Sequence, residues 1–292
     1  MKRSFLPLVF RLRFFPKRVA SFFSQYVMPR ENYYFLYKKG GMRMFLGGSW
    51  GPQNSMLYYD PETYEKEMNP VLRVVLDCSG RPPAVIDVGA NWGQTLFKVK
   101  LFCPRTVVHS FDAFPQMVHF LREMVKVNGW DDVFPHCLLL SSERKTAKIF
   151  FKKDSGMDTA STVEGFQRFF DSAVEADSIT LDEFTRLKNI DHITLIKIDV
   201  EGGELEVIEG ARETLERMKP DILLELLYSP GHRQARVIEV LQGMGYHFYH
   251  LMSNGELILE EQVTPDPAYR LLNYFVSLKS LGDLKKLSLK VK

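Results

Sequence analysis

Residues 195–215, LIKIDVEGGELEVIEGARETL, join an apolar run to an amphipathic run through a pair of glycines. The first part predicts a buried β-strand, in which three charged residues alternate with aliphatic ones: Lys197, Asp199 and Glu201. Because side chains on a strand point to opposite faces in turn, these three charges are expected to share one face. The second part, 203–218, predicts a helix. A strand followed at once by a helix is typical of parallel α/β sheets, in which ligands bind beyond the carboxyl ends of the strands.

The same alternation extends over most of the 292-residue chain. Strands are predicted at 84–88, 107–111, 134–140, 193–200, 221–227, 246–251 and 273–278. Helices are predicted at 64–76, 94–101, 115–127, 203–218 and 232–244. This order indicates an α/β fold: a doubly wound, mostly parallel seven-stranded sheet with helices on both faces. An insertion at 145–177 adds one predicted strand and an exposed loop, of the kind that covers a ligand crevice.

A glycine-containing turn follows the first of these strands, in the sequence AVIDVGANWGQ at 84–94. Gly89, Asn91 and Gly93 allow the chain to turn sharply and to approach a ligand closely at a helix N-terminus. Asp112, 23 residues after Gly89, ends the next strand, where a carboxylate commonly binds the ribose of an adenosine cofactor. The central glycine of the dinucleotide fingerprint GxGxxG is absent, which disfavours a nicotinamide-dependent oxidoreductase, the main alternative enzyme class.

Composition is that of an ordinary globular protein, with 38 basic and 36 acidic side chains and a net charge of +2. The near-neutral balance and the lack of a basic, aromatic-interleaved tract argue against a nucleic-acid partner. The three cysteines are few, unevenly spaced and without a CxxC pair. They argue against a disulfide scaffold or a zinc site and favour a reducing compartment, so a cytoplasmic location is predicted.

The two ends of the chain carry the basic excess. Residues 1–57 form a basic and aromatic N-terminal extension, and its first thirty residues contain seven Lys or Arg and no acid. Drawn as a helix, residues 1–30 are amphipathic, which is typical of a segment on an anionic membrane surface or docked to a partner. No apolar run reaches the roughly 20 residues that span a bilayer. A disordered leader and an organelle transit peptide are the alternatives, and 281–292 form a basic C-terminal tail.

The segments VIDVGANWGQ, HSFDAFPQMVHFLREMVKVNG, SITLDEF, LIKIDVEGGELEVIEGARETL and PDILLEL together resemble the FkbM family of methyltransferases. The resemblance covers about 58–278 and implies a class I, Rossmann-like methyltransferase domain, set here at 58–280, with S-adenosylmethionine as methyl donor. It implies O-methylation of a sugar hydroxyl in a glycan, a glycolipid or a related metabolite. The implied cofactor-binding residues are Asp87, Gly89, Ala90, Asn91, Gly93, Asp112, Ala113 and Ser141. The family commonly has Phe-Glu-Pro where this chain has Phe111, Asp112 and Ala113.

Methyl transfer to a hydroxyl requires an aligned acceptor and a group that removes its proton. Asp199 and Glu201 are the candidate catalytic acids at the end of the fourth strand, with Lys197 beside them. Two alternatives stay open. The carboxylates, with Glu225 as a third acid, would hold a divalent ion that acidifies the hydroxyl, or Lys197 and Asp199 form a structural ion pair. From another functional class, the chain would be an assembly factor that binds cofactor without turnover.

Overall fold

The computed structural model describes residues 33–36, 41–46, 65–151, 160–163, 170–227, 232–264, 272–287 and 289–292. Its centre is an eight-stranded sheet in the order β13-β12-β14-β11-β10-β3-β4-β5. The strands are β3 (Ala84–Val88), β4 (Val107–Asp112), β5 (Val133–Cys137), β10 (Leu195–Ile198), β11 (Asp221–Glu225), β12 (His247–Leu251), β13 (Leu257–Glu260) and β14 (Asn273–Ser277).

The pairings confirm a mostly parallel sheet. Strands β5, β4, β3, β10 and β11 are parallel to one another, whereas β14 pairs antiparallel with both β11 and β12. The predicted number of seven strands is wrong by one, because β13 adds an antiparallel edge strand beside β12. The segment LILE that forms β13 has only four residues.

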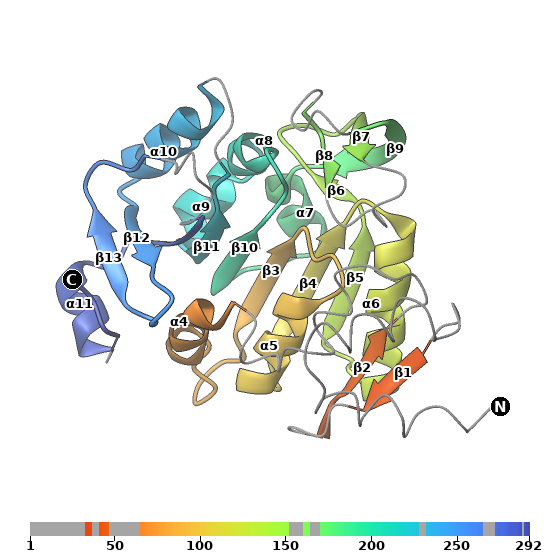
Figure 1. Cartoon of the computed structure of the whole chain (residues 1–292), viewed down its shortest axis with the longest axis horizontal. Helices are drawn as coiled ribbons and strands as arrows, with labels where there is room; N and C mark the ends of the chain where they lie inside the picture. Colours follow the sequence, from red (N-terminus) through yellow and green to blue (C-terminus); the bar gives the residue numbers. More distant parts are fainter. Residues whose placement is uncertain are drawn as a thin grey trace, which may run out of the picture.

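Helices cover both faces of the sheet, as predicted (Figure 1). One apolar core joins the sheet to α4 (Asn69–Val75), α5 (Gln94–Phe102), α6 (Pro115–Asn128) and α11 (Leu281–Lys286). The other joins it to α7 (Leu181–Leu187), α8 (Glu204–Glu209), α9 (Arg212–Met218) and α10 (Arg233–Gly243). Alternation along each strand divides the side chains between these cores. On β10, for example, Leu195 faces the first core and Ile196 the second.

The predicted helix at 203–218 is two helices, α8 and α9, separated at Gly210. A Cβ atom at Gly210 would lie 2.0 Å from the backbone oxygen of Ser141. The helix is therefore interrupted where it must pass directly against the segment after β6 (Leu139–Leu140). The amphipathic period continues across this break, which is why the sequence predicts a single helix.

The insertion forms a small sheet at one end of the main sheet. Its strands are β6, β7 (Thr146–Phe151), β8 (Ala160–Ser161) and β9 (Ser172–Ile179), in the order β6-β9-β7-β8. Figure 1 shows this sheet at the end toward which β3, β4 and β5 point. The predicted extra strand is confirmed as β7, whereas β9 was not predicted. Most of the predicted exposed loop, 152–159 and 164–169, lies outside the described residues.

Part of the N-terminal extension is structured. Strands β1 (Tyr33–Leu36) and β2 (Arg43–Leu46) form an antiparallel pair that contacts α6. The segment 1–30, for which membrane contact was predicted, lies outside the described residues. Across the described part of the chain, no helix is both long enough and apolar enough to cross a bilayer. The last residues, 281–292, pack on the domain, since Leu284 and Val291 are buried and Val291 bridges to β13.

One expectation from the cysteines is corrected by the structure. Cys78 and Cys103 form a disulfide that links the segments following α4 and α5, and Cys137 is the free, exposed cysteine. The pairing depends on α4 and α5 lying against each other, which a count of three cysteines cannot reveal. The cysteine content therefore no longer supports a reducing compartment.

A close backbone approach joins the glycine turn to the segment that ends β10. Gly89 has a φ of +76°, and a Cβ atom there would lie 1.8 Å from the backbone oxygen of Asp199. The amide of Asp199 donates a 3.1 Å hydrogen bond to the carbonyl of Val88. Glycine at 89 is therefore required both by backbone conformation and by space.

Gly89→Ala is expected to lower the free energy of unfolding by at least about 3 kcal/mol, since left-handed strain adds to overpacking. Gly129→Ala is the matched control, because Gly129 has a φ of +66° with no atom within 4 Å of its added Cβ. That variant should lose only about 1 kcal/mol. Urea unfolding measures both. Equal losses would show that the contact with Asp199 does not constrain residue 89.

Candidate active site

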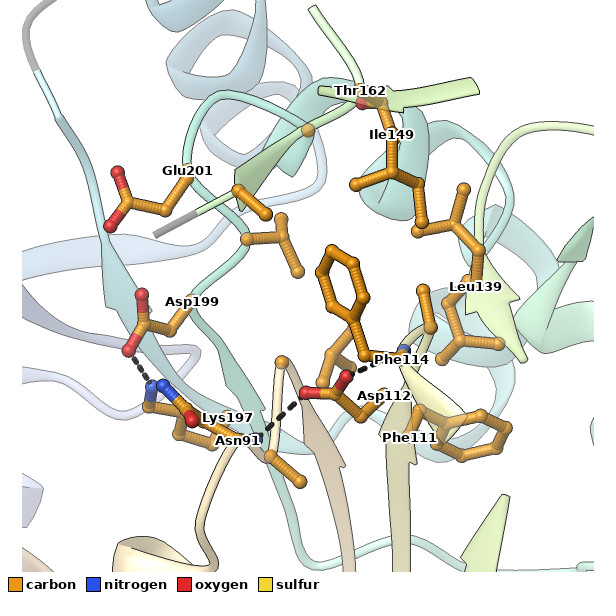
Figure 2. A pocket seen from close by; sticks show the side chains of 18 of the residues that line it. Asn91, Phe111, Asp112, Phe114, Leu139, Ile149, Thr162, Lys197, Asp199 and Glu201 are labelled. Atoms are coloured by element: carbon orange, nitrogen blue, oxygen red, sulfur yellow. Dashed lines mark hydrogen bonds and ion pairs between the residues drawn. The ribbon is translucent and has the colours of Figure 1, made fainter. Parts of the chain in front are cut away.

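A cavity of about 350 Å³ lies beyond the carboxyl ends of β3, β4, β10 and β11. Figure 2 shows its two unlike sides, with Lys197, Asp199 and Glu201 on one and apolar side chains such as Leu139 and Ile149 on the other. The position agrees with the rule that open α/β sheets bind ligands beyond the carboxyl ends of their strands. Of the predicted cofactor-binding residues, six line the cavity: Gly89, Ala90, Asn91, Asp112, Ala113 and Ser141.

Hydrogen bonds to β4 and packing against α6 hold the glycine turn in place. The amides of Gly89 and Ala90 donate to the carbonyl of Phe111, at 3.0 and 2.9 Å. Gly93 begins α5 with a φ of +82° and does not line the cavity, since its missing side chain makes room for Leu121 and Met124 on α6. Gly93 therefore serves the fold, although the motif predicts it as a cofactor contact.

Asp87, like Gly93, does not line the cavity. Its carboxylate is buried, and neither oxygen has a hydrogen-bond partner among the described residues. Burial raises its pKa to about 7, against the lowering effect of Lys197, which is its register partner on β10. Asp87 is thus placed to act on the cavity through Lys197.

Asp112 joins the ends of β3 and β4. Its carboxylate accepts 2.9 Å hydrogen bonds from the amides of Asn91 and Phe114 (Figure 2). Burial raises its pKa to about 6, although these two bonds favour the ionised form. Asn91 itself has a φ of +46°, a conformation that asparagine tolerates better than most residues. The predicted ribose contact thus has a structural role as well, because Asp112 fixes the turn that faces the cavity.

The apolar side comes from β4, the segment around β6, and the insertion. Phe111, Leu140 and Ile149 are buried there, and Ser141 lies beside them with its amide bonded to the carbonyl of Ile179. These residues make an apolar region of the kind that suits an adenine ring. Thr162 also lines the cavity, so the described part of the insertion does reach it, as expected.

The predicted ion pair between Lys197 and Asp199 is present. Lys197 is buried at the end of β10, and its ammonium group donates to Asp199 (Figure 2). Burial would lower the pKa of Lys197, but Asp199, Glu65 and Asp87 together raise it above its ordinary value. Burial would raise the pKa of Asp199, and the charge of Lys197 holds it below its ordinary value. Both groups are therefore charged at neutral pH.

Glu201 lies past the strand, since β10 ends at Ile198 and not at Val200 as predicted. Its orientation is therefore set by the turn and not by strand alternation. Its φ of +51° is unusual for a glutamate, and such backbone strain is common at functional sites. Burial, Asp199 and Glu204 raise its pKa to about 7. Glu201 is thus a cavity acid whose charge changes near neutral pH.

The turn after β10 is held by its own acids. Glu204 accepts a 2.8 Å hydrogen bond from the amide of Gly202, which agrees with its predicted role at the helix start. Arg233, on α10, donates to the carbonyl of Gly202 and to the carboxylate of Glu206. Glu206 lines the cavity. The sequence did not indicate Arg233, because it lies 27 positions from Glu206 along the chain.

Two more acids complete the polar side. Glu225, at the end of β11, has its pKa raised to about 10 by burial, by a hydrogen bond with Asp199 and by the charge of Asp199. Glu65 precedes α4 and is held by Lys98, whose ammonium group donates to the Glu65 carbonyl at 2.9 Å. From the sequence, Glu225 was considered only as a possible metal ligand. Glu65 was not predicted, since no motif surrounds that residue.

The described residues contain no group of three His, Cys, Asp or Glu side chains arranged to hold a metal ion. Asp199 and Glu225 are engaged with each other and with Lys197. The metal-binding interpretation therefore gains no support from the described residues.

The cavity fits the chemistry of S-adenosylmethionine. The apolar region beside Ser141 suits the adenine, and the carboxylate of Asp112 lies where a ribose would be recognised. The acids near Lys197 suit the positive charge of a sulfonium and an amino group. The turn at Gly89 lets the backbone form the floor of the cavity, since a side chain there would meet Asp199.

Several solved structures are similar to this chain at low identity and low TM-score. Precorrin-6y C5,15-methyltransferase from Geobacter metallireducens is 16% identical over 73% of this chain and 88% of its own, with a TM-score of 0.38. Aeropyrum pernix fibrillarin with bound S-adenosyl-L-methionine is 13% identical over 74% and 76%, with a TM-score of 0.41. The Bacillus cereus O-methyltransferase in complex with SAH is 9% identical over 72% and 79%, with a TM-score of 0.39. No curated protein matches the chain significantly.

The family assignment comes from the sequence of the domain itself. The model of the methyltransferase FkbM domain matches residues 87–248, more than half of the chain. That range includes the glycine turn, Asp112, the insertion and the whole strand–turn–helix segment after Leu195. The chain therefore belongs to the FkbM-domain methyltransferases and is an enzyme whose methyl donor is S-adenosylmethionine.

Proposed function

We propose that the protein is an O-methyltransferase that methylates a sugar hydroxyl of a glycan, a glycolipid or a related metabolite. The observation that carries this proposal is the placement of Asp199 and Glu201 together on the polar side of the cavity, opposite its apolar region (Figure 2). Carboxylates accept hydrogen bonds from hydroxyl groups and can take their protons. The sugar is the acceptor class that the family resemblance implies.

When bound, S-adenosylmethionine supplies an electrophilic methyl group on a positively charged sulfur. The chain must then hold the acceptor oxygen in line and remove its proton. Asp199 is suited to orient the hydroxyl, because the pair with Lys197 holds its carboxylate in place and keeps it ionised. Glu201 is suited to take the proton, because a pKa of about 7 makes it a stronger base than an ordinary glutamate.

The insertion supports exclusion of water and selection of the acceptor. Thr162 reaches the turn after β10, since a Cβ atom at Gly203 would lie 3.2 Å from its hydroxyl oxygen. Residues on either side of 160–163 belong to the loop that the sequence predicts as the acceptor-selecting segment. A peripheral membrane contact through 1–30 would suit a lipid-linked sugar and stays a prediction, as does a cytoplasmic location.

Glu201→Gln is expected to reduce kcat by about 10²- to 10⁴-fold, because an amide cannot accept the proton. In the parent enzyme, burial raises the pKa of Glu201 to about 7, so kcat should rise with pH through 7 as the carboxylate ionises. The variant should lose this rise. Glu216→Gln, at an exposed position on α9, is the matched control and should keep both rate and pH profile. A Glu201→Gln variant with the parent's rise near pH 7 would assign the base to another group.

A methyl label from S-adenosylmethionine should pass to a sugar hydroxyl in a panel of neutral saccharides, glycolipids and a control RNA, read by mass spectrometry. Asp199→Asn should lower the yield at least tenfold, since loss of a charge-assisted contact costs about 1.5–3 kcal/mol. Label on RNA alone would contradict the sugar acceptor. Cofactor binding without transfer to any acceptor would favour the assembly-factor alternative.

A further inference from the structure

Asp199 and Glu225 form a carboxyl–carboxylate pair at the base of the polar side. They occupy equivalent positions at the ends of neighbouring parallel strands, because each directly follows a residue of the register pair formed by Ile198 of β10 and Leu224 of β11. A hydrogen bond joins their side chains. Two ionised carboxylates are both acceptors and cannot hydrogen-bond to each other, so this pair contains one proton.

The surrounding charges decide which residue holds the proton. Lys197 donates to Asp199, which favours the ionised form of that partner. Among the described residues, no cation forms an ion pair with Glu225. Burial, the hydrogen bond with Asp199 and the charge of Asp199 raise its pKa to about 10, although the charge of Lys197 lowers it. On its other side, Glu225 faces β14, where its register partner is the uncharged Asn273.

Taken together, these contacts surround one carboxylate with two donors. Lys197 approaches Asp199 from its own strand, and the carboxylic acid of Glu225 approaches it from β11. Both donors leave free acceptor positions on Asp199 for a group in the cavity, which all three residues line.

We propose that Glu225 is a positioning residue that acts as a neutral carboxylic acid: it donates a hydrogen bond to Asp199 and, with Lys197, aims that carboxylate at the acceptor hydroxyl. The inference rests on the proposed function for its kinetic consequence but not for the charge state itself. It differs from the metal-ligand interpretation of Glu225, because a carboxylate that binds a divalent ion would have to be ionised.

The charge state is tested without any turnover. The infrared spectrum of the purified enzyme at pH 8 should contain a protonated carboxylic-acid C=O band that disappears in Glu225→Gln and persists in the control Glu216→Gln. The band should vanish only near pH 10 as the acid ionises. Absence of the band at pH 8, with a folded protein by circular dichroism, would overturn the proposal even if methyl transfer were shown.

The positioning role is tested by substitution. Glu225→Gln keeps the shape, the neutrality and a donor, so kcat should stay within about threefold of the parent. Glu225→Ala removes the donor, and kcat should fall about 10- to 100-fold with KM for S-adenosylmethionine unchanged. In an Asp199→Asn background the same Ala substitution should cost less than about twofold, since Glu225 acts through Asp199.

The outcomes separate the two hypotheses. If Glu225→Gln is as inactive as Glu225→Ala, or if the parent loses activity with a chelator and Glu225→Gln loses metal, Glu225 is ionised and the proposal fails. If the parent methylates no acceptor but shows the carboxylic-acid band, the proposed function fails and the neutral state of Glu225 stands.

Discussion

The pairing of β3 with β10 is the contact on which the rest of the site depends. It brings Asp87 beside Lys197 and ends where the amide of Asp199 binds the carbonyl of Val88. Immediately beyond it the chain has room for nothing larger than glycine at position 89. One strand pair therefore places the glycine turn and the acids Asp199 and Glu201 beside the same cavity. A shift of one residue in its register would send Lys197 to the opposite face of the sheet.

Charge balance is the second constraint. The buried side chain of Lys197 lies among the carboxyl groups of Asp87, Asp199 and Glu65. Its charge lowers the pKa of each of these acids, whereas their burial raises it. Removing water from ionised groups is costly unless they are paired. Burial therefore favours the neutral form of Glu225, whereas the pair with Lys197 keeps Asp199 charged. The same burial gives Glu201 a pKa close to neutrality. Two strands and a turn thus bring three acids of different charge state into one site: Glu225 is neutral, Asp199 is ionised and Glu201 titrates near neutral pH.

Most of the fold followed from periodicity, because the strands and helices around Gly89 and Lys197 have clear apolar patterns. The ion pair of Lys197 with Asp199 also followed, since residues two apart on a strand share a face. Features that depend on contacts between distant segments did not: the edge strand β13, the break at Gly210 and the disulfide of Cys78. Glu65 and Arg233 were missed for the same reason. Gly93 and Asp87 match a cofactor motif, yet neither residue lines the cavity. A sequence motif gives the positions of residues but not which side of the chain faces the ligand.

Isothermal titration calorimetry tests the central claim most directly, because it asks whether the cavity is built for an adenosine sulfonium cofactor. The parent protein should bind S-adenosylmethionine and not NAD. Asp112→Ala should weaken binding of S-adenosylmethionine at least tenfold, since it removes both a ribose-facing carboxylate and the bonds that hold the turn at Asn91. Tight binding of NAD, with none of S-adenosylmethionine, would contradict the account.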